Sequence, residues 1–110
     1  MSPKSGVMKP NVPESIVVTI LGKQWEMCWR KRLPSVGRGK VCHGECDSPD
    51  TPGKQIRIRA GLSDEEHLDV LIHEMLHAAA WHIREDLVDQ FATDVAAVLV
   101  RLGWVRDKGD

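Results

Sequence analysis

The sequence predicts an α+β fold in which a short antiparallel sheet of about three strands precedes two antiparallel helices. In the first half of the chain, apolar and polar side chains alternate over short runs, as expected for strands that are buried on one face. In the second half, apolar side chains recur every three or four residues, as expected for amphipathic helices. The 110 residues, 42% of them apolar, are enough for one domain with one modest core.

The strands are predicted from β-branched and alternating segments. Residues 1–14 contain three prolines and few apolar side chains, so we expect a loose tail ahead of a single domain over residues 15–110. Residues 16–21 form a β-branched run and residues 25–29 alternate, which together favour a hairpin. Residues 55–59 alternate again and give the third strand.

A capping box marks the start of the first helix. Ser63 stands where an N-cap is expected and Glu66 follows three residues later, so their side chains can bond backbone N–H groups of the first turn. Apolar residues then continue at helical spacing to about Trp81, where we expect the helix to end.

A second helix is predicted from about Glu85 to Leu102, with Gly103 as its C-terminal stop. Its apolar residues have helical spacing, and we expect Phe91 and Val95 to face the core. The short connection makes the two helices antiparallel neighbours, so the start of the second lies beside the end of the first.

The first helix carries the motif H-E-x-x-H over residues 73–77. Residues four apart share a face, so His73 and His77 can direct two imidazoles at one metal ion. Glu74 is rotated by about 100°, off the ligand line but within reach of a water on that ion. This is the arrangement of zinc metallopeptidases, with Glu74 as general base. Asp69, one turn before His73, can accept a hydrogen bond from its ring and orient it.

A catalytic zinc needs a third protein ligand, and three residues after the motif are candidates. Glu85 and Asp89 lie one turn apart at the start of the second helix, beside the predicted position of His77. His82 is about 140° around the helix from His77, so it can bind only if the first helix breaks near Trp81.

The segment Asp89 to Ala92 resembles the E-x-F-A sequence of gluzincins, seen as N-E-G-F-A in zinc aminopeptidases. In that family the acidic residue is the third zinc ligand, so the resemblance implies Asp89 in that role, with aspartate in place of glutamate. The shorter side chain requires a close approach of the helices, which Ala78 and Ala92 permit. Glu85 and then His82 remain the alternatives.

The wider layout resembles small phage-encoded zincin-like metallopeptidases over residues 16–106. The resemblance rests on the H-E-x-x-H helix and on three segments: G-E-C-D at Gly44 to Asp47, P-G-K-x-I-R-I at Pro52 to Ile58, and L-G-W at Leu102 to Trp104. It implies a minimal zincin-like domain that binds Zn²⁺ and hydrolyses peptides or proteins in the cytoplasm, that of the host cell for a phage protein. The SprT-like DNA-repair proteases are a looser match that shares only the metal helix.

Composition disfavours several other classes. The 15 basic and 16 acidic residues give a net charge of −1, which argues against a nucleic-acid partner and a SprT-like DNA-associated protease. No apolar run is long enough for a membrane span, and the first residues lack the apolar stretch of a secretory signal. Three cysteines are too few for a disulfide framework and favour a reducing compartment. The alternative to an enzyme is a zinc-stabilised module that binds a partner.

Three further expectations concern the surroundings of the site. The chain has no tyrosine, so His43, His82, an arginine or zinc alone must stabilise the oxyanion, a role that gluzincins commonly give to Tyr or His. Cys42 and Cys46 have the spacing of a zinc pair, but a structural site needs four ligands, which favours a loop with free thiols. The strand at residues 55–59 directly precedes the metal helix, and its edge is expected to hold an extended substrate by strand addition.

Overall fold

The computed structural model describes residues 14–33 and 43–104. These residues form, in order, β1 (Ser15–Ile20), β2 (Lys23–Arg30), β3 (Gly44–Cys46), β4 (Gln55–Arg59), α1 (Asp64–Ala79) and α2 (Glu85–Arg101). The α+β class, the first hairpin and the strand at residues 55–59 are confirmed. Apart from Glu14, the predicted tail lies outside the described residues, and so does Cys42.

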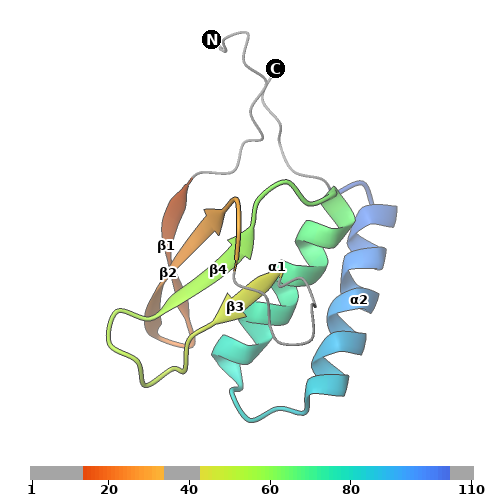
Figure 1. The fold of residues 1–110 in the computed structure, drawn as a ribbon. Coiled ribbons are helices and arrows are strands. Elements are labelled where there is room, and N and C mark those ends of the chain that lie inside the picture. Colours follow the sequence, from red (N-terminus) through yellow and green to blue (C-terminus); the bar gives the residue numbers. More distant parts are fainter. Residues whose placement is uncertain (1–13, 34–42, 105–110) are drawn as a thin grey trace, which may run out of the picture.

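The sheet has four strands in the order β1-β2-β4-β3 and is mixed, so the prediction of three antiparallel strands was wrong. β2 runs parallel to β4, with Met27 opposite Ile56 and Trp29 opposite Ile58, whereas the other two pairs are antiparallel. The cause is topological. β3 lies between β2 and β4 in the chain and runs opposite to both, so β4 returns in the direction of β2 (Figure 1).

α1 is the central layer of the molecule. It packs against the sheet on one side and against α2 on the other, and α2 contacts no described strand (Figure 1). The space between the sheet and α1 is filled by side chains that are at most 3% exposed: Trp25, Met27, Ile56 and Ile58. Trp29 Nε1 donates a hydrogen bond to His67 Nε2 at 2.8 Å, which ties β2 to the first turns of α1.

The start of α1 and the end of α2 lie at the signals that the sequence carries. The Ser63 hydroxyl accepts a hydrogen bond from Glu66 N, and the Glu66 carboxylate accepts one from Ser63 N, so the capping box is confirmed. α1 ends at Ala79, two residues before the predicted end. Gly103 follows α2 with a φ of 93°, the left-handed stop that was predicted. Neither helix of the described segments is long and apolar enough to cross a bilayer.

The face that α2 turns to α1 differs from the predicted one. Phe91 is 53% exposed, whereas the residues that are fully buried are Val88, Ala92 and Ala96, each at 0%. The prediction that Phe91 faces the core was therefore wrong, while Val95 is half-buried. Small side chains let two helix backbones approach closely, and the alanine-rich side of α2 consequently faces α1 rather than its bulkiest side chains.

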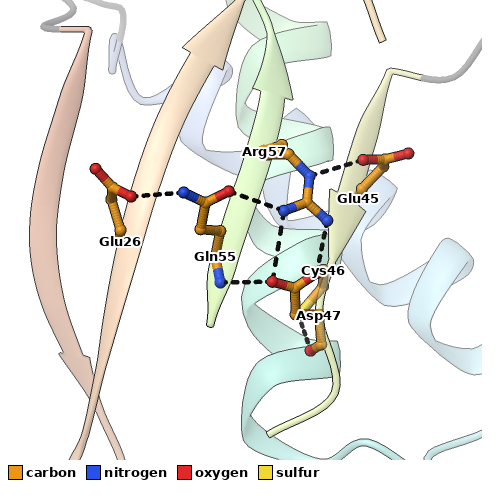
Figure 2. Close-up of polar contacts among 6 residues, drawn as sticks. All are labelled: Glu26, Glu45, Cys46, Asp47, Gln55 and Arg57. Atoms are coloured by element: carbon orange, nitrogen blue, oxygen red, sulfur yellow. Dashed lines mark hydrogen bonds and ion pairs between the residues drawn. The ribbon is translucent and has the colours of Figure 1, made fainter. Parts of the chain in front are cut away.

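A polar network covers the outer face of the sheet and fixes the short strand β3. The Arg57 guanidinium on β4 bonds Glu45 at 2.7 Å and Asp47 at 2.6 Å (Figure 2). Asp47 also accepts a hydrogen bond from Gln55 N at 2.9 Å, and Gln55 Nε2 donates to Glu26 on β2 at 2.6 Å. A three-residue strand has few ladder bonds of its own, so these side chains set its position.

Because of this network, Asp47 should contribute to the unfolding free energy in a way that depends on pH. The hydrogen bond from Arg57 lowers the pKa of Asp47 below its usual 3.8. The contribution is therefore fully present above that usual value and is lost as pH falls through the lower folded-state pKa. Asp47→Asn should cost about 1–3 kcal/mol of unfolding free energy at neutral pH, and less in acid. Denaturant unfolding from about pH 7 down to about pH 2 measures this, with Asp50→Asn as the neutral control.

The hairpin turn carries a strained residue. Leu21 and Gly22 both have positive φ, 48° and 80°, as in a type I′ turn, and the Leu21 side chain is 78% exposed. Leucine is poorly suited to this conformation and asparagine tolerates it, so Leu21→Asn should raise the unfolding free energy by about 0.5–1 kcal/mol. Leu21→Val should lower it, because β-branching worsens the strain. Equal stabilities of the three proteins would contradict the turn assignment.

Candidate metal centre

α1 brings the two histidines of the motif together. His73 and His77 lie one turn apart, with ring centroids 4.8 Å from each other. Both side chains are mostly buried, at 19% and 15% exposure. Their rings therefore lie side by side at the seam between α1 and α2, each with limited freedom to turn away.

Glu85, the first residue of α2, bridges the two imidazoles. Its carboxylate oxygens lie 3.1 Å from His73 Nε2 and 3.0 Å from His77 Nε2. One ligand atom from each of the three residues can be chosen so that all lie within 4.8 Å of one another. The helix N-terminus suits a carboxylate at this place, since its dipole favours negative charge.

Asp89 touches the other side of the His73 ring. Its Oδ1 atom lies 3.1 Å from His73 Nδ1, whereas Glu85 faces Nε2 of the same ring. A metal-binding imidazole commonly donates its second ring N–H to a carboxylate, which fixes its tautomer and orientation. Asp89, predicted as the third ligand, thus lies where such an orienting group would be, and Glu85 lies where a ligand would be.

The remaining predicted residues lie further along the seam or outside it. Asp69 accepts a hydrogen bond from Thr93 Oγ1 at 3.1 Å, while the His73 nitrogen predicted to bond it faces Asp89. His82 lies in the connection between the helices, where it is exposed. Thr93 is a seam residue that the sequence pattern gave no reason to single out.

Glu74 is buried between α1 and β3, with 7% of its surface exposed. A Cβ atom on Gly44 would lie 2.9 Å from Glu74 Oε2 and 2.6 Å from Val70 Cγ1, so only glycine allows β3 this close to α1. Burial raises the pKa of the Glu74 carboxyl to about 7, and the nearby Glu85 and Glu45 carboxylates act in the same direction. A carboxyl tuned in this way can exchange a proton near neutral pH.

A cavity of about 170 Å³ opens beside Glu74. It lies between the start of β3 and the seam side of α1, and its lining residues are His43, Gly44, Asp69, Val70, His73 and Glu74. Of the two histidines predicted as oxyanion partners, His43 therefore shares a cavity with the motif. The Arg59 N–H donates to the His43 carbonyl at 2.8 Å and anchors its backbone to the end of β4.

The donor set suits a divalent metal ion, and zinc is one that uses it. Two imidazoles and one carboxylate form a known three-ligand set of catalytic zinc, with metal–ligand distances of about 2.0–2.2 Å. Two atoms bound tetrahedrally at such distances are about 3.4 Å apart. The observed His–Glu separations of 3.1 and 3.0 Å, each to a different Glu85 oxygen, are a few tenths of an ångström shorter, and one ligand atom from each of the three residues lies within 4.8 Å of the others.

Cys46 does not belong to this group of ligand atoms. Its side chain packs against the core, and burial, aided by the Glu74 and Asp47 carboxylates, raises the pKa of its thiol to about 12. A thiol with such a pKa stays protonated at neutral pH. Its predicted partner Cys42 lies outside the described residues.

Comparisons with models of protein families, with curated proteins and with solved structures give no match. The site itself consists of His73, His77 and Glu85, a group able to hold a metal ion, with Glu74 next to His73 in the chain.

Calorimetric titration of the protein with Zn²⁺ tests the roles of three residues at the seam between α1 and α2. We expect about one site per chain. His77→Ala and Glu85→Ala should each weaken binding by more than the roughly 10–100-fold expected for Asp89→Ala, which removes only an orienting partner. His82→Ala is the matched control and should bind as the wild type does. Loss of the metal in Asp89→Ala but not in Glu85→Ala would instead make Asp89 the third ligand.

Proposed function

We propose that the protein is a zinc metallopeptidase of the H-E-x-x-H type, in which His73, His77 and Glu85 hold the metal and Glu74 is the general base. The observation that carries this proposal is the position of Glu74: its side chain is buried and lines a cavity together with His73, the candidate ligand that directly precedes it. A purely structural zinc site closes all four positions with ligands and has no use for a base. The burial of Glu74 therefore favours an enzyme over a zinc-stabilised binding module.

The protein's own residues have distinct roles in this proposal. A bound zinc ion would supply Lewis acidity, which polarises the substrate carbonyl and lowers the pKa of water. Glu74 takes the proton of the attacking water and returns it to the leaving amine. Asp89 holds His73 in the tautomer that leaves Nε2 for the metal. His43, in the same cavity, is the group that can donate a hydrogen bond to the oxyanion.

The substrate is proposed to be an extended peptide that lies along β3. β4, whose edge was predicted to bind it, is covered by β3 on one side and by β2 on the other. Hydrogen bonds from Arg59 N to His43 O and from Asp47 N to Gln55 O show which residues of this segment face β4. Along a strand, the backbone N–H and C=O groups of successive residues point alternately to its two sides. Those of Cys46, the residue before Asp47, therefore point away from β4. Strand addition there would place the peptide beside Glu74.

Glu74→Gln separates hydrolysis from metal binding. The variant keeps the shape of the side chain but not its basicity, so zinc content should be unchanged while peptide turnover falls by roughly 100-fold or more. Digestion of an unbiased peptide library, read by mass spectrometry, measures turnover, and elemental analysis measures the metal. Glu65→Gln, an exposed substitution in the first turn of α1, is the matched control and should cleave normally.

Two results would contradict this function. Cleavage by Glu74→Gln at the wild-type rate would show that Glu74 is not the base. A wild-type protein that binds zinc but cleaves no peptide in the library would leave the binding module as the better account.

A further inference from the structure

α2 exposes an apolar stripe that no described part of the chain covers. Four large apolar residues of this helix and its C-cap are more than half exposed: Leu87 at 51%, Phe91 at 53%, Val98 at 54% and the C-cap Leu102 at 69%. α2 contacts α1 but no described strand, so within residues 14–33 and 43–104 only α1 packs against it. Large exposed apolar patches on monomeric proteins are often functional.

The stripe lies away from the metal centre. Taking about 100° per residue, its four members fall within about 60° of one another around the helix axis. Their centre is about 100° from the buried side marked by Ala92, and nearly opposite Asp89. Asp94, which borders the stripe, accepts a hydrogen bond from Gln90 Nε2 at 3.0 Å, so its carboxylate is held on the polar side of the helix. A partner on the stripe would leave the cavity and the seam accessible.

We propose that this stripe is the contact between two copies of the chain, with the two α2 helices packed antiparallel about a two-fold axis. The spacing of the stripe is the same read in either direction. Its successive members, Leu87, Phe91, Val98 and Leu102, are separated by four, seven and four residues. In an antiparallel pair centred between residues 94 and 95, Leu87 is therefore level with Leu102 of the second copy, and Phe91 with Val98. Each chain thus offers the same self-complementary surface, as a two-fold interface requires.

The area available is that of a small dimer interface. The four stripe residues and Trp104, which is 62% exposed just beyond the helix, together expose roughly 600 Å² of surface per chain. Two copies could bury at most roughly 1,200 Å² of it, the lower end of the range for specific protein interfaces. We therefore expect a dimer that dissociates in the micromolar range, with Phe91 near its centre as the main contributor.

Sedimentation velocity of the full chain, with Zn²⁺ present, tests the dimer. The wild type should approach twice its 12.3 kDa mass at concentrations of about 100 µM and dissociate on dilution. Phe91→Glu and Val98→Lys should each raise the dissociation constant by roughly 100-fold or more, because each puts a charge against an apolar partner. Val17→Ser removes an apolar residue that is 69% exposed on β1, and this control should leave the dimer intact.

An equimolar mixture of the two charged variants tests the antiparallel pairing itself. A mixed dimer would set the introduced glutamate against the introduced lysine and keep one native Phe91–Val98 pair, so association should return. Circular dichroism should show both variants folded, since the altered side chains are more than half exposed. A wild type that stays monomeric at about 100 µM, a stripe variant that dimerises normally, or a mixture that stays monomeric would each overturn the proposal.

Discussion

The candidate site depends on the antiparallel register of α1 against α2. His77 meets Glu85, His73 meets Asp89 and Asp69 meets Thr93, so each step of four residues down one helix is matched by four residues up the other. This register follows from the short connection after Ala79 and from the alanine side of α2, which allows a close approach. A shift by one helical turn would move a different carboxylate onto the two imidazoles.

The sheet contributes the second requirement, a buried base. Arg57 and its acidic partners hold β3 at the edge of the sheet, and β3 in turn presents Gly44 to the side chain of Glu74. The close approach of Gly44 contributes to the burial that raises the pKa of the Glu74 carboxyl. The outer polar network and the inner glycine thus act on the same element from opposite faces, and they connect the stability of the sheet to the chemistry of α1.

Features set by local sequence could be predicted, and features set by the packing of distant elements could not. The capping box at Ser63 and the spacing of His73 and His77 are properties of one helix, and both are as expected. The choice between Glu85 and Asp89 depends on the register between two helices, which no local pattern encodes. β3 has three residues and begins with glycine, too little for an alternating pattern, although Glu45 and Asp47 flanking Cys46 match the charge of Arg57 across the strand pair.

X-ray absorption spectroscopy of the zinc-loaded protein tests the metal centre most directly. A centre built from His73, His77 and Glu85 should give a spectrum with two imidazole nitrogens and carboxylate or water oxygens at about 2.0–2.2 Å, and no sulfur neighbour. The imidazole contribution should fall by half in His77→Ala protein loaded with zinc. A scatterer at about 2.3 Å, the distance of a cysteine sulfur, would contradict a centre built from His73, His77 and Glu85.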